Sequence, residues 1–365
     1  MSIWRAGSGN DLSSADRCLR CVLDVIGTGG SDWRKSRSRK RCTVSKITQS
    51  DIAAAAGRAS RRISELVVET PLEYSWRFSA ETGAEVYLKL ENLQHTGSFK
   101  IRGATNRLLT LTAEERAAGC VVASSGNHGA AVTYAMRKLD IDGVVFVPQQ
   151  TSTTKIEAIK TYGGEVRFFG TDGLDTEEHA REYASKHGMF YLSPYNDPDV
   201  IAGQGSCGIE IAAQLPDVQA AFIAVGGGGL IGGVGSVLKS HNSDISIFGC
   251  QPAASAVMCR SIEAGGIVDI PIQPTLSDGT AGGIEAGSIT FDLCQQVVDD
   301  FILVDEEQIA AAMCRFIDWQ HQLIEGAAGV AIAAMEARGK SIQGKKVVVL
   351  ICGGNVSRDT LRTII

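Results

Sequence analysis

The sequence HTGSFKIRG, residues 95–103, decides how this chain is interpreted, because it places Lys100 beside small residues at the start of a helical pattern. That pattern covers residues 99–111 and begins at Lys100 itself. A cation at a helix N-terminus opposes the helix dipole, so the position is unfavourable for a lysine without a function. A partly buried lysine can lose its proton and attack an aldehyde, which an arginine cannot do. An ordinary surface lysine at a helix start is the alternative interpretation.

Two further runs would complete a site around this lysine. They are SSGNHG, residues 124–129, and GGGGL, residues 226–230. Each follows an apolar segment typical of a buried strand, CVVASS at residues 120–125 and AFIAV at residues 221–225. A glycine-rich turn between a strand and a helix offers backbone N–H groups to a phosphate. An aldehyde and a phosphate on one small molecule indicate pyridoxal 5'-phosphate.

Four other landmarks follow in order: VIAGQG at residues 200–205, DGTAGG at 278–283, LIEGAAGV at 323–330 and CGGNVS at 352–357. With the first three runs, they resemble the pyridoxal-phosphate-dependent serine/threonine dehydratase and serine racemase group. The resemblance covers the chain from about residue 47 onward. It implies the tryptophan synthase β-like fold (fold type II), an α/β fold of two doubly wound open parallel-sheet domains with a cleft between them. Residues 46–121 and 197–365 would form the large cofactor-binding domain, and residues 122–196 a small mobile domain.

The resemblance also implies the site residues. Lys100 would hold the cofactor covalently, and Lys100 and Ser125 would be the catalytic residues. The cofactor would be bound by Phe99, Lys100, Asn127, Gly226, Gly227, Gly228, Gly229, Leu230, Glu325 and Cys352. The substrate would be bound by the run Ser124, Ser125, Gly126, Asn127 and His128. Within this run the asparagine faces the cofactor ring in the family, so His128 is expected to be structural; Asp278 would lie near the cofactor or substrate.

The glycine run has two alternative interpretations. It also satisfies the dinucleotide fingerprint GxGxxG at Gly227, Gly229 and Gly232. A dinucleotide site requires an acidic residue at the end of the next strand, where this chain has Gln251. The dinucleotide interpretation is therefore disfavoured, and a purely structural glycine turn is the other alternative.

Other site candidates have structural alternatives too. Ser124, Ser125 and Asn127 are good helix-capping residues. Cys352 ends the strand pattern KVVVLIC, residues 346–352, at a position where the family usually has a serine, sometimes a cysteine, facing the pyridine nitrogen. A thiol is a weak neutral donor, so the strength of that hydrogen bond is in question, and a buried inert cysteine is the alternative.

The implied reaction is β-elimination: dehydration and deamination of a 3-hydroxy L-amino acid such as threonine or serine to a 2-oxo acid and ammonia. Two other reactions remain open. One is a serine or hydroxyaspartate racemase, in which Ser125 would be the second acid/base; the other is β-replacement, as in cysteine synthases. A non-catalytic pyridoxal-binding protein would require a damaged site, and none of the site residues except Cys352 is even mildly unusual.

Several features favour elimination. GTDGLDTE, residues 170–177, lacks the arginine that serine racemases carry there. QPAASAV, residues 251–257, has Gln251 and Val257 where related sequences carry carboxylates for a divalent cation, so we expect no metal requirement. Cysteine synthases usually have threonine and glycine before the loop asparagine. No regulatory domain is expected after Ser357, and hence no feedback inhibition by isoleucine.

The composition is that of an ordinary globular protein. The 365 residues are 44% hydrophobic and 21% charged, with a formal net charge of −6 and a pI near 5.6. The acidic balance disfavours a nucleic-acid partner, and no apolar run has the length of a membrane span. We expect a cytoplasmic homodimer that acts on a small-molecule substrate. The ten cysteines are scattered, so they predict buried free thiols, and the pair Cys18 and Cys21 lacks the partners of a zinc site.

Residues 1–45 differ from the rest of the chain. They contain the basic cluster RKSRSRKR, residues 34–41, and show weak periodicity, which predicts a poorly ordered extension. A targeting peptide is the alternative, although four aspartates are unusual in such a segment. From Thr48 the pattern alternates helix and strand, beginning with a helix over residues 49–66 that Ser50 could cap. Strands are predicted at residues 85–91, 120–125, 144–148, 165–169, 221–225, 245–251 and 346–352, and helices at 128–139 and from about Gly232.

Overall fold

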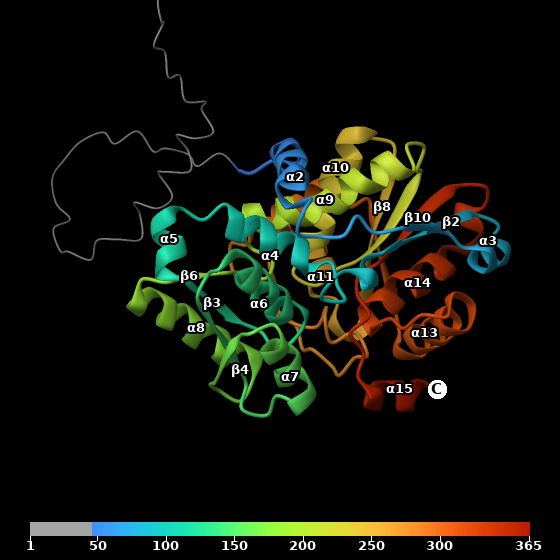
Figure 1. Cartoon of the computed structure of the whole chain (residues 1–365). Helices are drawn as coiled ribbons and strands as arrows, with labels where there is room; N and C mark the ends of the chain where they lie inside the picture. The colour runs from blue at the N-terminus through green and yellow to red at the C-terminus, as the bar shows by residue number, and fades with distance from the viewer. Residues whose placement is uncertain (1–45) are drawn as a thin grey trace, which may run out of the picture. The chain divides into compact units, whose positions relative to one another are not determined.

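The computed structural model describes residues 46–365 (Figure 1). The predictions for residues 1–45, including the basic extension and the pair Cys18 and Cys21, lie outside the described residues. Ile47–Ile365 form one unit that contains a six-stranded and a four-stranded sheet.

The larger sheet has the strand order β1-β2-β10-β7-β8-β9. Its strands are β1 (Leu72–Tyr74), β2 (Glu85–Leu90), β7 (Ala220–Ala224), β8 (Ser246–Pro252), β9 (Asp300–Val304) and β10 (Lys346–Ile351). All neighbours pair in parallel except β1, which is antiparallel to β2 at one edge. The central strands β7 and β10 are buried along almost their whole length, as apolar strands covered on both faces are. The predicted parallel sheet is confirmed, and β1 and β9 are added to it.

Helices cover both faces of this sheet. On one face α14 (Gly326–Arg338) packs against β7, β8 and β10 and is itself covered by α13 (Glu306–Gln320). On the other face lie α10 (Gly229–His241), α9 (Pro198–Gln214) and α2 (Gln49–Ile63), which pack against one another (Figure 1). This arrangement is the doubly wound α/β architecture expected from alternating strand and helix patterns.

The smaller sheet has four parallel strands in the order β5-β4-β3-β6. They are β3 (Cys120–Ala123), β4 (Gly143–Val147), β5 (Glu165–Phe168) and β6 (Phe190–Tyr191). The helix α8 (Gly173–His187) covers one face, and α6 (Asn127–Leu139) and α7 (Thr153–Thr161) cover the other. The apolar cluster on the α6 face also includes Ile101 and Leu108 of α4 (Lys100–Leu109). The division of the chain into domains at residues 122 and 196 stays a prediction.

The remaining helices connect these layers. They are α3 (Trp76–Thr82), α5 (Ala113–Ala118), α11 (Val257–Ala264), α12 (Ile289–Val297) and α15 (Arg358–Ile364). Within residues 46–365 no helix combines the length and apolar character required to cross a membrane. The seven cysteines in this range are free thiols, six of them buried, as predicted.

Two helix starts differ from the sequence prediction. The cap of α2 is Thr48 rather than Ser50: its hydroxyl accepts from the Asp51 backbone N–H at 3.2 Å, and the Asp51 carboxylate accepts from the Thr48 N–H. The second helix, α10, begins at Gly229 and not near Gly232. Gly228 has φ +87°, a left-handed conformation that ends the loop directly before Gly229.

Candidate active site

The segment before Lys100 lies beside the end of β10. The Phe99 N–H donates to the Cys352 carbonyl at 3.0 Å, and Ser98 forms an isolated bridge with Gly353. Because β10 is a central strand, neighbouring strands on both sides hold its carboxyl end in place. α4 therefore begins, at Lys100, next to the end of the strand that is followed by Cys352.

The Lys100 side chain is half-buried and its amine is held by the backbone. Lys100 Nζ donates to the Pro194 carbonyl at 3.1 Å and lies 5.2 Å from the centroid of the Phe99 ring. Burial lowers the pKa of Lys100 to about 8, although the nearby Glu325 and Cys352 act in the opposite direction. A lysine with this pKa is partly neutral near pH 7 to 8, which is the condition for nucleophilic attack on a carbonyl.

The glycine run lies between β7 and α10. Gly228 is the N-cap residue of α10, and a glycine has no side chain with which to cap the first turn of this helix. The Thr290 hydroxyl fixes the loop by donating to the Gly227 carbonyl at 2.6 Å. Leu230 is buried in the large apolar core. A phosphate group can bind the uncapped N–H groups at the start of a helix, and the glycines before the helix let it approach the backbone closely.

Close packing explains why glycine fills this run. A Cβ atom on Gly227 would lie 2.5 Å from the Tyr195 ring, and one on Gly226 would lie 3.0 Å from the Thr280 backbone. On Gly229 it would meet the Cβ of Tyr195 at 3.0 Å. The Tyr195 hydroxyl in turn accepts from the Glu285 backbone N–H at 2.9 Å. Side chains larger than hydrogen would displace the tyrosine or the loop.

The loop between β3 and α6 carries the SSGNHG residues. Ser124 Oγ accepts from the Gly126 N–H at 3.2 Å, and the Ser125 hydroxyl forms no hydrogen bond among the residues that the structure describes. Asn127 opens α6, and its Nδ2 donates to both carboxyl oxygens of Glu325, at 2.8 and 3.1 Å. This side chain therefore links the smaller sheet to the start of α14.

His128 has a different environment from its neighbours. The ring is buried, and its Nε2 lies 3.1 Å from the Leu192 carbonyl, which can only accept, so this nitrogen carries the proton. Burial, together with the charge of Lys100, lowers the pKa of His128 to about 3. The imidazole is neutral throughout the physiological range and joins α6 to the segment after β6.

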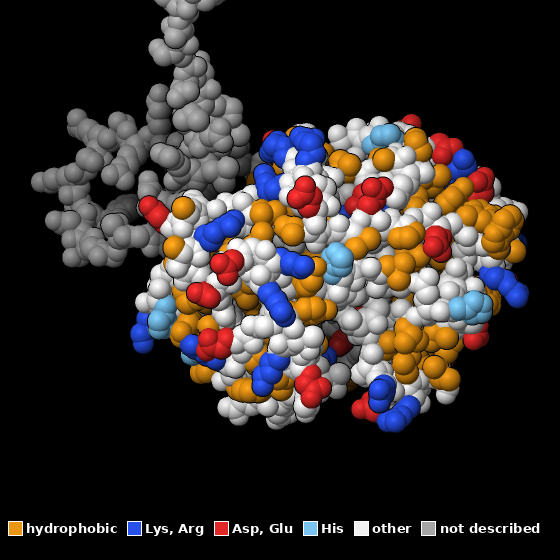
Figure 2. All heavy atoms as spheres, in the orientation of Figure 1, with side chains coloured by type: hydrophobic (Ala, Val, Ile, Leu, Met, Phe, Trp, Pro, Cys, Tyr) orange, Lys and Arg blue, Asp and Glu red, His pale blue; other side chains and the backbone are white. Residues whose placement is uncertain are grey.

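Glu325 and Cys352 form the floor of the site. The Cys352 thiol donates to Glu325 Oε1 at 3.7 Å, and the Glu325 N–H donates to the Gly353 carbonyl at 3.2 Å. Burial raises the pKa of Glu325 to about 7, against the effect of the Asn127 hydrogen bonds. Burial also raises the pKa of the Cys352 thiol, so that Sγ keeps its proton. Figure 2 shows a hollow between the part of the molecule with α6 and α7 and the part with α13 to α15, with an acidic side chain deep inside it.

The structure brings most of the predicted residues together. Direct contacts join Phe99, Lys100 and Cys352, and Asn127, Glu325 and Cys352. The glycine run is joined to Lys100 through one short segment, since Pro194 contacts the amine and Tyr195 packs on Gly227. Asp278 is more exposed and pairs with Lys155 of α7 at 3.3 Å.

Three contributors were missed by sequence reasoning. Pro194 acts through its carbonyl, which carries no residue signature. Tyr195 follows a strand of two residues, too short to be recognised. Asn355 lies in the landmark CGGNVS, and its Nδ2 donates to Asn127 Oδ1 at 2.7 Å and to the Thr96 carbonyl at 2.9 Å. The run CGGNVS indicated that this segment belongs to the site, but it did not indicate that Asn355 is the residue that contacts Asn127.

This geometry fits pyridoxal phosphate. An amine with a lowered pKa could hold the aldehyde, and the uncapped start of α10 could hold the phosphate. The Cys352 thiol at the end of β10 keeps its single proton, which it donates to Glu325 in this structure and would give to the pyridine nitrogen instead when the cofactor is bound, as a neutral partner. Among residues 46–365, no group of three or more His, Cys, Asp or Glu side chains is placed to hold a metal ion. The prediction of metal independence stays a prediction.

Comparison with known proteins agrees with this geometry. A family model described as pyridoxal-phosphate dependent enzyme matches residues 63–353. An L-threonine ammonia-lyase of Thermotoga maritima is 39% identical over 319 residues, which are 87% of this chain and 78% of the relative.

Two solved structures are also similar. The processed form of threonine deaminase isoform 2 from Solanum lycopersicum has a TM-score of 0.82 at 34% identity, covering 86% of this chain and 93% of that one. Maize serine racemase has a TM-score of 0.81 at 30% identity, covering 85% and 95%. They confirm the predicted fold. The chain therefore belongs to the family of pyridoxal-phosphate dependent enzymes, and its cofactor is pyridoxal phosphate.

Proposed function

We propose that this enzyme is an ammonia-lyase that removes water and then ammonia from a 3-hydroxy L-amino acid, with L-threonine as the first candidate and L-serine as the second. The observation that carries the proposal is the half-buried Lys100 amine, whose pKa is lowered to about 8 at the end of a central strand. The 39% identity to an L-threonine ammonia-lyase supports the choice of substrate.

Each group of residues has a proposed task. The first amides of α10 and the run Gly226 to Leu230 hold the phosphate, while Phe99, Asn127, Glu325 and Cys352 surround the ring. Ser124, Ser125, Gly126 and Asn127, at the start of α6, bind the substrate carboxylate, and His128 supports this loop from behind. When bound, pyridoxal phosphate withdraws electrons from the Cα of the substrate and so acidifies its proton.

The reaction then follows from proton positions. Lys100 Nζ takes the Cα proton, and the electron pair left on Cα forms the Cα–Cβ double bond as the Cβ–O bond breaks. The leaving hydroxyl accepts a proton, which the Lys100 amine returns, and departs as water. The enamine product becomes an imine, and water hydrolyses it to the 2-oxo acid and ammonia. Lys100 is placed to act as base because its pKa lies close to neutral pH.

The proposal is tested by the release of 2-oxo acid from L-threonine, L-serine, 3-hydroxyaspartate and 3-phenylserine. Purified protein is supplied with pyridoxal phosphate, and Lys100→Ala is the control. We expect turnover with L-threonine and its loss in the variant. Absence of turnover on all four substrates, although the cofactor is bound, would contradict the proposal.

A serine or hydroxyaspartate racemase is the second candidate. The similarity to maize serine racemase favours it, and so does Ser125, whose hydroxyl forms no hydrogen bond within residues 46–365. A racemase needs a second acid/base opposite the lysine, and Ser125 would take that role. Chiral chromatography decides: formation of D-serine faster than pyruvate would favour this candidate, and Ser125→Ala should then abolish D-serine formation.

The proposal extends to the oligomeric state of the enzyme, its cellular location and the movement of its small domain. We infer a homodimer in the cytoplasm, in which residues 122–196 move as a small domain against residues 46–121 and 197–365. The proposed dimer follows the general rule that dimers are the commonest oligomers of soluble proteins. Light scattering after size exclusion tests the dimer, and small-angle scattering with and without L-threonine tests the movement.

A further inference from the structure

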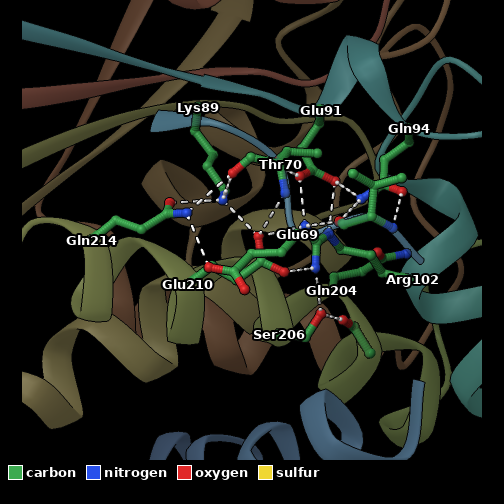
Figure 3. A network of polar contacts seen from close by, with 12 residues as sticks. Glu69, Thr70, Lys89, Glu91, Gln94, Arg102, Gln204, Ser206, Glu210 and Gln214 are labelled. Atoms are coloured by element: carbon green, nitrogen blue, oxygen red, sulfur yellow. Dashed lines mark hydrogen bonds and ion pairs between the residues drawn. The ribbon is translucent and has the colours of Figure 1, made fainter. Parts of the chain in front are cut away.

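A cluster of buried charged side chains lies behind the first turn of α4 (Figure 3). The Arg102 cluster consists of Arg102, Glu91, Glu210 and Lys89. The side chains of Arg102, Glu91 and Lys89 are fully buried, and that of Glu210 is 12% exposed. Its two positive and two negative charges balance. Interior charges are rare unless they are paired, so this position requires a physical reason.

Arg102 uses its guanidinium on two carboxylates at once. Its Nε and Nη2 donate to the two oxygens of Glu91, each at 2.7 Å. Its Nη1 and Nη2 donate to the two oxygens of Glu210, at 2.6 and 2.8 Å. Further bonds go to Ser206 Oγ at 3.0 Å and to the Val68 carbonyl at 3.3 Å. The two bidentate pairs hold the guanidinium from two sides and so fix the orientation of its plane.

Lys89 and Thr70 complete the cluster. Lys89 Nζ donates to Glu210 Oε2 at 2.6 Å, to the Thr70 carbonyl at 2.7 Å and to Gln214 Oε1 at 3.0 Å, so all three of its protons are used. The Thr70 hydroxyl donates to Glu91 Oε1 at 2.5 Å. Burial would raise the pKa of Glu91, but the charge and hydrogen bonds of Arg102 bring it below its ordinary value. The carboxylate therefore stays ionised and keeps its hold on Arg102.

The cluster joins three elements at the active site. Glu91 directly follows β2, whose last residue Leu90 pairs with Ile351 of β10, the neighbour of Cys352. Glu210 belongs to α9, and Arg102 belongs to the first turn of α4. Arg102 thus connects α4 to the carboxyl ends of β2 and β10, where Cys352 lies, through Glu91. It also connects α4 to α9 through Glu210.

Lys100 is held from the opposite side of the same helical turn. Arg102 lies two positions after Lys100, a rotation of about 200° around the helix axis. Lys100 therefore points to Pro194 while Arg102 points into the cluster. The N-cap residue of α4, Phe99, makes no side-chain capping hydrogen bond. The first turn is fastened instead by Arg102 and, one residue on, by the Gly103 N–H, which donates to Gln204 Oε1 at 3.3 Å.

We propose that Arg102 is a positioning residue for the reaction: its two bidentate pairs fix the first turn of α4 and thereby aim the Lys100 amine. The inference rests on the proposed role of Lys100, whichever substrate the enzyme uses. A lysine at position 102 would keep the charge but lose the planar fork, so the turn could rotate and shift. Displacement of a reacting group by about 1 Å lowers turnover by up to about a hundredfold. Substrate affinity depends on the loop at the start of α6 and is expected to change little.

The test compares cofactor-loaded wild type, Arg102→Lys and Arg315→Lys. Arg315 makes the same fork-to-carboxylate contact with Glu336, between α13 and α14, so it controls for the loss of a bidentate pair elsewhere in the fold. Rates are expressed per bound cofactor and measured well below each unfolding midpoint. This removes the part of the effect that is due to stability alone.

We expect kcat of Arg102→Lys to fall by about tenfold or more, with KM within about threefold of wild type. Two readouts need no turnover. The visible circular dichroism of the bound cofactor should weaken at equal occupancy, and amide hydrogen exchange of residues 98–104 should accelerate. Arg315→Lys should resemble wild type in all three. If the wild type fails to turn over L-threonine, the dichroism and the exchange still decide the role of Arg102.

The inference would be overturned by an Arg102→Lys enzyme whose kcat, dichroism and exchange equal those of wild type, whatever its melting temperature. Should Arg102→Lys not fold, Glu210→Gln takes its place. Glu210 is partly exposed, and the amide keeps one oxygen for Arg102, so the variant is milder. The same loss of dichroism, in smaller measure, supports the inference, and an unchanged spectrum and kcat contradicts it.

Discussion

Replacing Glu325 by glutamine should leave the stability of the cofactor-free protein nearly unchanged at pH 5 and should stabilise it increasingly as the pH rises to 7.5. Burial raises the pKa of Glu325 from its ordinary value of 4.5 to about 7. The unfolded chain therefore loses this proton at lower pH than the folded protein does. Where the unfolded state binds fewer protons, stability falls as the pH rises, so ionisation of Glu325 favours unfolding over this interval.

The magnitude follows from the two pKa values. Ionising a carboxyl whose pKa is raised from 4.5 to about 7 costs about 3 kcal/mol in total, and about 2 kcal/mol of this falls between pH 5 and 7.5. Glutamine does not titrate, but it loses one of the two oxygens that accept from Asn127, at a cost of about 1 kcal/mol at every pH. The two proteins should be about equally stable at pH 5, with the variant about 2 kcal/mol more stable at pH 7.5.

The assay is urea unfolding of the cofactor-free proteins at four pH values in this interval. The interval stops at 7.5 so that it stays below the pKa of Lys100, which burial lowers to about 8. Wild type and Glu325→Gln are unfolded side by side at each pH, and the difference between their free energies of unfolding is compared across the four values. Parallel stability curves for wild type and Glu325→Gln would refute the reasoning.

Three further predictions concern cofactor binding, the Cys352 thiol and the metal requirement. Gly228→Ala should raise the dissociation constant for pyridoxal phosphate at least about tenfold, because alanine at φ +87° costs about 1–2 kcal/mol. Its Cβ would also lie 2.9 Å from Met258 and 3.0 Å from Thr290. An absorbance titration that gives equal affinities for wild type and variant would contradict this. Cys352→Ser should keep activity within about fivefold, since both side chains are neutral donors; complete loss of 2-oxo acid release at full cofactor occupancy would show that the thiol is required. Treatment with a chelator should leave the rate unchanged, and a large loss restored by added cation would contradict metal independence.

The sequence predicts the sheets well because parallel strands buried on both faces are short β-branched runs. The strands at residues 346–351 and 220–224 were placed to within a residue or two. The edge strand Leu72–Tyr74 was missed because three residues cannot display a period, and its pairing depends on a partner that begins more than ten positions later.

Residue types with a chemical signature could be assigned to the site, and backbone groups could not. Lys100 and the glycine run are recognisable because few residues can do their tasks. The Pro194 carbonyl is not, since any residue could supply it. Arg102 shows a further limit: in the sequence it resembles a surface arginine, and its partner Glu210 lies 108 positions away. Only the folded chain reveals that both lie in the interior.

The most direct test of the central claim is the stoichiometry of products from L-threonine. The account predicts that the wild type releases 2-oxobutanoate and ammonia in equal amounts, and that Lys100→Ala releases neither while it still binds pyridoxal phosphate non-covalently. Equal release of both products by Lys100→Ala would contradict the assignment of Lys100 as the base.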